Sequence, residues 1–169
     1  LSKKKVKIND VILAIPSSGV HSNGYSLIRS VIKKNIVPIK IKKDLLEPTK
    51  IYSKEVLKLV NKNYINACAH ITGGGLVENL LRSVPENFSI EIDLSKIKIN
   101  KIFKWIKSKN ITDKEMMKTF NCGVGFCLIA PRKNLKKIIR FFPKKYLPYE
   151  IGKIVNNKEK IKQLNSLKW

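Results

Sequence analysis

Two segments of this 169-residue chain share one order: a short apolar run, a polar turn with glycine, and a helical pattern. In the first, the apolar run Asp10–Ile15 ends at Pro16, and apolar residues recur at helical spacing from about Gly24. In the second, the run Tyr64–Ala69 leads into HITGGG, and leucines follow at helical spacing. Short apolar runs of this kind are typical of strands buried on both faces of a sheet. The repeated order predicts an α/β domain in which each turn precedes a helix.

Both turns are rich in groups that bind anions. A helix start offers free backbone N–H groups and the positive end of the helix dipole, and glycine lets a ligand approach the main chain. Hydroxyl, amide and imidazole groups add side-chain hydrogen bonds. Read alone, the first turn is as typical of an ordinary helix cap with a bend as of an anion site, but the two turns together predict a site for a nucleotide-sized phosphate ester. The candidate residues are Ser17, Ser18, Gly19, His21, Ser22, Asn23, Gly24, His70, Thr72, Gly73, Gly74 and Gly75.

Other kinds of site are less well supported by the sequence. Neither turn fits GxxxxGK[ST] or GxGxxG, so neither is a Walker loop or a Rossmann fingerprint. Ser17 and His21 suggest nucleophilic catalysis, but the serine lacks a GxSxG setting and a partnered carboxylate. The odd number of cysteines, Cys68, Cys122 and Cys127, without a CxxC pair, predicts free buried thiols in a reducing compartment. The three scattered cysteines and two histidines do not have the number and spacing of ligands that a zinc site needs, so we expect no metal site.

The remainder of the chain continues the alternation of strands and helices. We expect further strands at 88–94, 126–130 and 149–155, and helices after Pro48, at 102–106, after Thr112 and after Pro131. The helix after Pro48 should bury Val56, Leu57 and Val60, and Thr112 and Glu115 should form a capping box. The predicted fold is a single three-layer α/β (α+β) domain over residues 1–155, with a mixed sheet of about five or six strands flanked by helices. The Lys-rich residues 156–169 are expected to form a basic tail or a frayed helix.

The net charge of +23 raises the possibility of a nucleic-acid-binding protein. However, the basic residues are 31 Lys against 4 Arg, spread along the chain without an aromatic-interleaved stripe. Arg is the usual residue for recognising bases and phosphates. Because Lys, Ile and Asn all have AT-rich codons, biased base composition is the preferred explanation. No apolar run approaches the roughly 18 residues of a membrane helix, and the N-terminus lacks a signal-peptide pattern, so we expect a cytoplasmic protein.

Several stretches together resemble one enzyme family. PSSGVHSNGYSLIR, LLEPTKIYSKEVLKL, AHITGGGLVENLLRSVP, the DLS at 93–95, MMKTFNCGVGF and YEIG are similar, in this order, to the C-terminal half of the phosphoribosylformylglycinamidine cyclo-ligase (AIR synthetase) family. The resemblance covers nearly the whole chain. HSNGYSL and HITGGG are the specific pair, because related ATP-using families share the architecture without both motifs. A half of such a related ATP-dependent enzyme, or a basic nucleic-acid-binding domain, is the alternative.

This resemblance implies ATP- and Mg²⁺-dependent closure of the imidazole ring of aminoimidazole ribonucleotide from formylglycinamidine ribonucleotide, in purine biosynthesis. It also implies a homodimer whose N-terminal half binds ATP and Mg²⁺ through acidic motifs. Those motifs are missing and the chain opens at Leu1, so we expect a C-terminal half that is inactive alone. The two turns would then line the substrate cleft, with His21 and His70 as candidate catalytic residues.

Two departures from the family pattern affect this interpretation. The family commonly has PTR and FNMG, where this chain has Lys50 and Cys122. Cysteine for methionine is expected to be a packing change. Lysine for arginine would lose the planar fork that binds phosphate, so Lys50 is not among the candidate site residues.

Overall fold

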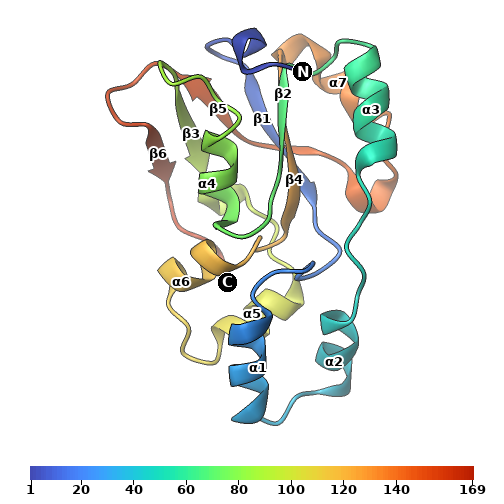
Figure 1. Ribbon diagram of the computed structural model, residues 1–169, viewed down its shortest axis with the longest axis vertical. Coiled ribbons are helices and arrows are strands. Elements are labelled where there is room, and N and C mark those ends of the chain that lie inside the picture. Colours follow the sequence, from blue (N-terminus) through green and yellow to red (C-terminus); the bar gives the residue numbers. More distant parts are fainter.

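Six strands form one mixed sheet in the computed structural model, which describes residues 1–169 (Figure 1). They are β1 (Val11–Pro16), β2 (Ala67–His70), β3 (Ser89–Asp93), β4 (Val124–Ala130), β5 (Tyr149–Val155) and β6 (Ile161–Leu164), in the spatial order β2-β4-β1-β5-β3-β6. All neighbouring pairs are antiparallel except β3 and β6, which are parallel. The predicted mixed sheet of five or six strands is confirmed.

Strand β1 lies in the middle of the sheet, as its uninterrupted apolar sequence predicts. Its residues from Val11 to Ile15 are all fully buried. Because successive side chains of a strand point to opposite faces, Ile12 and Ala14 pack in one apolar cluster, whereas Val11, Leu13 and Ile15 pack in the other. A central strand with helices over both faces needs apolar residues at every position, so its lack of alternation reflects its place.

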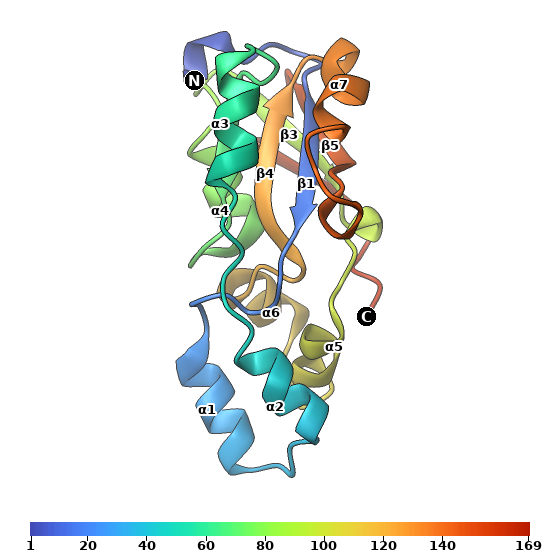
Figure 2. The same ribbon diagram turned by 90° about the vertical axis from the view of Figure 1, so that its right-hand side faces the viewer.

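Seven α-helices surround this sheet: α1 (Tyr25–Lys33), α2 (Ile39–Leu45), α3 (Ser53–Asn61), α4 (Gly75–Leu81), α5 (Lys101–Lys107), α6 (Asp113–Thr119) and α7 (Leu135–Ile139). Short 3₁₀ turns occur at Lys3–Lys5, Leu94–Lys96, Arg132–Asn134 and Lys144–Tyr146. Figure 2 shows α3 and α7 on one face of the sheet, and α1, α2 and α5 beyond its lower end. The longest α-helices have nine residues, so no helix here could cross a membrane.

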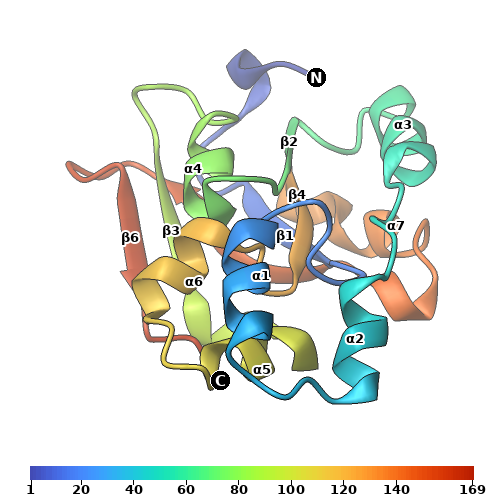
Figure 3. The same cartoon turned by 60° about the horizontal axis from the view of Figure 1, so that its bottom comes forward.

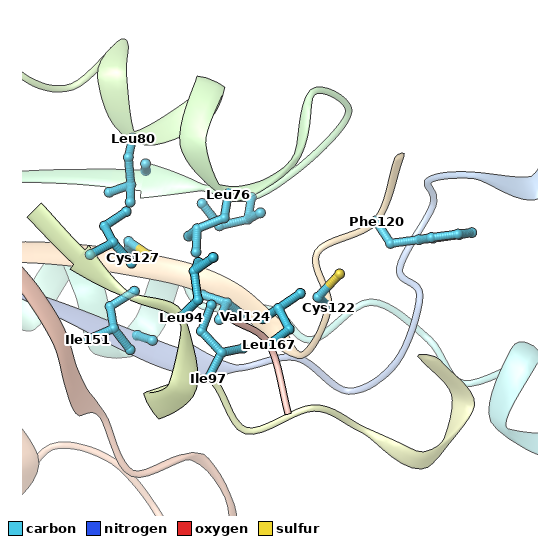
Figure 4. Packing of buried hydrophobic residues seen from close by; sticks show 14 of the residues in the cluster. Leu76, Leu80, Leu94, Ile97, Phe120, Cys122, Val124, Cys127, Ile151 and Leu167 are labelled. Atoms are coloured by element: carbon cyan, nitrogen blue, oxygen red, sulfur yellow. The ribbon is translucent and has the colours of Figure 1, made fainter. Parts of the chain in front are cut away.

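The larger of the two apolar clusters lies between the sheet and α4 and continues toward α5 and α6 (Figure 4). Leu76 and Leu80 of α4 pack there with Val124 and Cys127 of β4. Each Å² of apolar surface that this packing removes from water stabilises the fold by about 25 cal/mol. All three cysteines are free, as predicted; Cys122 and Cys127 are fully buried, whereas Cys68 is half-buried. Burial raises the pKa of Cys122 to about 12, so this thiol stays protonated.

The end of the chain differs from the prediction of a basic tail. Ile161–Leu164 forms strand β6, in which Ile161 pairs with Ile90 of β3. The side chain of Leu167 is buried in the larger cluster. The prediction was wrong because the apolar residues 161, 164 and 167 have helical spacing, and the strand itself, with Lys162 and Gln163 between Ile161 and Leu164, shows no apolar alternation. The domain therefore continues well beyond residue 155.

Two helical details also differ from the sequence reading. Helix α2 was not predicted, because only Ile41 and Leu45 of this Lys-rich segment are buried. In α3 the expected buried residue Leu57 is 59% exposed, and Leu59 takes its place in the core. The predicted cap of α6 is present, since the Thr112 side chain accepts a hydrogen bond from the Glu115 N–H at 3.2 Å.

Candidate functional site

The two glycine-containing turns leave the sheet at the same end. Strands β1 and β2 are each antiparallel to β4, which lies between them, so they run parallel to one another. Their carboxyl ends therefore point in one direction, and the turns that follow both enter the region below the sheet (Figures 1 and 3). A crevice outside the carboxyl ends of parallel strands is a common ligand site in α/β proteins. The topology thus brings the two sequence-predicted turns together.

Contacts between the turns confirm that they are neighbours. A Cβ placed on Gly73 would lie 3.9 Å from Oδ1 of Asn23 and would meet no other atom within 4 Å. The ring centroids of His21 and His70 are 6.1 Å apart. The main chain at Gly73 is therefore open to a ligand, beside the amide of Asn23.

The first turn is fixed by hydrogen bonds to the segment before α3. Ser18 Oγ donates to the carbonyl oxygen of Pro48 at 2.7 Å and accepts from the backbone N–H of Lys50 at 3.1 Å. The hydroxyls of Ser22 and Thr49 are 3.5 Å apart. Ser18 therefore supports the turn, because both hydrogen-bonding roles of its hydroxyl are already filled.

Two asparagines fix the same turn from the opposite side. Asn121, which is buried, donates to the carbonyl oxygen of Gly19 at 3.0 Å and accepts from the Gly123 N–H at 2.8 Å. Asn100 donates to the carbonyl oxygen of Ser17 at 3.2 Å. Each backbone carbonyl thereby receives the partner that a buried polar group requires. The conformation of the turn is thus determined by residues about 80 to 100 positions further along the chain.

His21 is the most constrained residue of the first turn. Its φ is 57°, a left-handed value that is uncommon outside glycine, although histidine is enriched among the exceptions. The side chain is buried, and Nε2 accepts a hydrogen bond from the Ser18 N–H at 3.3 Å. Burial and the neighbouring His70 lower the pKa of His21 to about 4. The imidazole is therefore neutral at pH 7.

Aromatic rings surround His21 at the start of β4. The Tyr52 and His70 ring centroids are 6.0 Å apart, and His70 also stacks on Phe126 at 5.8 Å. Gly125 provides the space for this packing, because a Cβ there would lie 2.7 Å from Cε1 of His21 and would overlap the Tyr52 hydroxyl. A groove adjoins the cluster, lined in part by Thr49, Lys50, Tyr52, His70 and Phe126. The candidate site thus has aromatic rings on one side.

The glycines of the second turn have different structural roles. Gly75 has φ 70°, and a Cβ there would collide with the carbonyl oxygen of Met117. At Gly74 a Cβ would collide with the Glu78 carboxylate, which also pairs with Arg82. A negative charge therefore already occupies the start of α4. Of the three glycines only Gly73 lies beside open space, so the part of this turn available to an anion is narrower than the sequence suggested.

Several supporting residues were not recognised from the sequence. Asn79 is buried, and its amide donates to the carbonyl oxygens of Gly75 at 2.7 Å and Gly73 at 3.1 Å. Thr72, a predicted site residue, donates from Oγ1 to Asn79 at 3.3 Å. A polar residue between Leu76 and Leu80 on the apolar face of a helix is a signal that could have identified Asn79. Tyr52, Asn100 and Asn121 carry no comparable signal, because their partners are distant in sequence.

Lys50 does not contribute a free charge to the site. Its Nζ lies 3.2 Å from Glu55 Oε1, and it stands over the rings of Tyr52 and Tyr146 at 5.2 and 4.6 Å. The amine also donates to the carbonyl oxygen of Ile51 at 3.2 Å. With these partners the ammonium group fixes the segment before α3.

Comparison with known families identifies the domain type. A family model described as "AIR synthase related protein, C-terminal domain" matches residues 7–164. The match includes both turns and also β6.

Curated relatives are cyclo-ligases and larger proteins of purine biosynthesis. The phosphoribosylformylglycinamidine cyclo-ligase of Streptococcus pneumoniae serotype 4 is 42% identical over 160 residues, which are 89% of this chain and 46% of the relative. That of Prochlorococcus marinus strain AS9601 is 39% identical, over 94% of this chain and 49% of the relative. The trifunctional purine biosynthetic protein adenosine-3 of Gallus gallus is 38% identical over 90% of this chain and 16% of its own length. The chain thus spans about half the length of the cyclo-ligases it matches.

Solved structures share the fold at low sequence identity. Thiamine-monophosphate kinase from Stenotrophomonas maltophilia superposes with a TM-score of 0.67 at 15% identity, over 99% of this chain and 54% of the other. T. maritima PurL complexed with ADP gives a TM-score of 0.60 at 11% identity, over 99% of this chain and 25% of the other. The same fold therefore occurs in proteins of very different sequence.

Proposed function

This chain belongs to the family of AIR synthase related proteins, as that family's C-terminal domain, and from this premise we propose that it is the substrate-binding half of a phosphoribosylformylglycinamidine cyclo-ligase. The reaction is the ATP-dependent closure of formylglycinamidine ribonucleotide to aminoimidazole ribonucleotide, with release of ADP and phosphate. We place it in cytoplasmic purine biosynthesis, in an enzyme that is a homodimer. The identity of 42% to a cyclo-ligase over 89% of the chain supports this choice within the family.

The observation that carries the proposal is the meeting of the two turns at one end of the sheet. Asn23 lies against the open main chain of Gly73, and the two histidines lie side by side. The groups that converge are neutral hydrogen-bond donors and acceptors, together with backbone N–H groups. Such groups bind and orient a ribonucleotide without supplying a strong acid or base. We therefore assign substrate positioning to this half.

The phosphoryl transfer is assigned to the other half of the enzyme. No three His, Cys, Asp or Glu side chains of this chain converge in a way that could hold a metal ion. Mg²⁺ is held by oxygen ligands, mostly carboxylates and phosphates, so the residues of this chain do not fit a Mg²⁺–ATP site by themselves. In the proposal the N-terminal half binds ATP and Mg²⁺.

Reconstitution tests the proposal directly. The chain alone is expected to be inactive, and addition of the N-terminal half of a cyclo-ligase is expected to restore ATP-dependent formation of aminoimidazole ribonucleotide. In the reconstituted pair, Asn23→Ala should raise KM for the ribonucleotide, whereas the exposed Asn156→Ala serves as the matched control. A correctly folded pair that binds ATP but closes no ring would refute the assignment.

The nucleic-acid-binding alternative has no comparable support. The family match accounts for residues 7–164, nearly the whole chain, without invoking its positive charge. Measurement of RNA and DNA binding at about 0.15 M salt checks this point, since purely electrostatic binding falls steeply with salt.

A further inference from the structure

The two ring nitrogens of His21 have different surroundings. Nε2 accepts the hydrogen bond from the Ser18 N–H at 3.3 Å. Nδ1 is buried and has no hydrogen-bond partner. The hydroxyl of Ser17, four residues earlier in the same turn, is also buried without a partner. Both side chains are more than nine-tenths buried, and unpaired polar groups in such positions require an explanation.

The hydrogen bond from Ser18 determines where the proton of the neutral ring lies. A backbone N–H can only donate, so Nε2 must present its lone pair. A neutral imidazole carries one proton, which must then be on Nδ1. Protonation of Nε2 would place two donors against each other, and burial beside His70 opposes the charged ring as well. His21 is thus a donor through Nδ1 that has no acceptor within the chain.

The surroundings of His21 prevent it from finding another partner. The ring packs against Gly125, where a Cβ would lie 2.7 Å from its Cε1, and its centroid is 6.1 Å from that of Tyr52. The turn itself is fixed by Asn121 on one side and by the hydroxyl of Ser18 on the other. A fixed, unpaired donor and a second unpaired hydroxyl in the same turn are the arrangement expected of a preorganised ligand site.

We propose that His21 acts as a neutral hydrogen-bond donor, whose Nδ1–H and the Ser17 hydroxyl together bind the phosphate group of the substrate, and that His21 does not act as a base. The identity of the substrate as a ribonucleotide rests on the proposed function, whereas the position of the proton does not. A phosphate suits the site because the turn leads into the nine-residue helix α1, whose N-terminus favours an anion. The His70 ring, whose centroid lies 6.1 Å from that of His21, is exposed.

The position of the proton can be measured on the 169-residue chain itself. ¹⁵N NMR of the two imidazoles, assigned with His21→Asn, should show His21 protonated at Nδ1 and unprotonated at Nε2 throughout pH 5–8. A proton on Nε2, or a His21 titration midpoint above pH 6, would overturn the inference whatever reaction the enzyme catalyses.

The ligand is tested by adding ribose 5-phosphate to the labelled chain, with ribose as the control. Ribose 5-phosphate should shift the His21 Nδ1 resonance, and ribose should not. If ribose 5-phosphate binds without shifting this resonance, or leaves the spectrum unchanged at millimolar concentration, the phosphate assignment is wrong.

Two substitutions separate the roles of the ring nitrogens in the reconstituted enzyme. His21→Asn places an amide near the position of Nδ1 and tolerates a positive φ, whereas His21→Gln places its amide nearer Nε2. Loss of a hydrogen bond to a charged group weakens binding by roughly 10-fold or more, so Gln should raise KM by about that factor and Asn by less, with kcat changed little in both. Thermal melts show whether each variant is folded, and if His21→Gln is not, His21→Ala replaces it.

The outcomes distinguish this inference from the proposed function. Equal KM values for wild type, His21→Asn and the second variant, in an enzyme that closes the ring, would refute the donor role and leave the function standing. Conversely, a shifted His21 resonance with ribose 5-phosphate in a pair that closes no ring would support the donor role and refute the function.

Discussion

The hydroxyl of Tyr52 donates a hydrogen bond to the carbonyl oxygen of Pro16 at 3.0 Å, and so joins the segment before α3 to the end of β1. Both the ring and the hydroxyl are buried, and burial raises the pKa of this hydroxyl well above its ordinary value. The phenol therefore remains a donor at any physiological pH. Tyr52 contacts the candidate site through His21 and Gly125, which makes it a positioning residue for the first turn.

Substitution of Tyr52 by phenylalanine should remove this hydrogen bond and keep the ring. Because the carbonyl of Pro16 would lose its partner, we expect a loss of about 1 kcal/mol in the free energy of unfolding. The reconstituted enzyme should also show a higher KM, since the first turn is less well fixed. Urea denaturation measures the stability, and Tyr146→Phe is the matched control because its hydroxyl makes no hydrogen bond here. An equal effect of both substitutions would contradict the role given to Tyr52.

Alanine at two glycines of the second turn should have very different effects on stability. Gly75→Ala requires a non-glycine residue at φ 70° and a Cβ in collision with the Met117 carbonyl, so it should cost more than about 2 kcal/mol. Gly73→Ala adds a methyl group to open space and should change stability by less than about 0.5 kcal/mol. The same methyl group would stand where the ligand approaches, and should therefore raise KM. Thermal melts and steady-state kinetics test the pair together, and similar melting temperatures for both variants would refute this reading of the second turn.

Removal of the Asn121 side chain should destabilise the first turn, because the two hydrogen bonds of this side chain are lost. Asn121→Ala leaves the Gly19 carbonyl and the Gly123 N–H without partners, and each buried unsatisfied group costs about 1–3 kcal/mol. The free energy of unfolding should therefore decrease by at least about 2 kcal/mol, because each of the two lost partners costs about 1 kcal/mol or more. Asn156→Ala, at an exposed position, should be neutral. An Asn121 variant as stable as this control would show that the turn does not depend on these bonds.

Stability should decrease as the solution becomes acidic, because His21 is neutral in the folded state. Its folded pKa is about 4, against an ordinary value of 6.5, so the unfolded chain binds the proton first as pH falls. The contribution is thus complete above about pH 6.5 and is lost between pH 6.5 and 4, with a size of at most about 3 kcal/mol. His70, whose pKa burial also lowers, adds in the same direction. Urea denaturation of wild type and His21→Asn from pH 4 to 8 should show a slope in this range that is smaller in the variant; identical slopes would contradict it.

The buried residue after β6 provides a test of where the domain ends. Leu167→Ala should cost about 2–5 kcal/mol, the usual range for a buried leucine. Leu147→Ala, at a position 38% exposed, should cost clearly less. Chemical denaturation measures both. Equal, small effects would restore the view of residues 156–169 as a tail.

The predictable parts of this fold are those that depend on local pattern. β1 and α1 follow from an unbroken apolar run and from helical spacing, and the two turns are evident from their glycines and hydroxyls. The family resemblance rests on the same local motifs. Strand β6 could not be predicted from its own residues, because it is stabilised by pairing with β3, which is far away in sequence.

The sequence identifies the two turns of the candidate site but not the residues that support them. His21 and Asn23 lie in a motif that can be read directly, whereas Asn121 and Tyr52 act on the turn through contacts that only the folded chain creates. The sequence also suggested one role for all three glycines of the second turn. Their differences arise from Met117 and Glu78, whose positions depend on how α6 and α4 pack.

The hydrogen bond between Asn121 and Gly19 joins residues 102 positions apart, and β1 pairs along its length with the equally distant β4. Pairings of such separation form late and slowly during folding, because a long loop must close before they contribute stability. The first turn therefore has no local folding unit of its own. The Ser17 N–H, which donates to the Gly123 carbonyl oxygen at 2.9 Å, should therefore exchange with solvent only when the whole domain opens, so binding competence and global folding are gained and lost as one event.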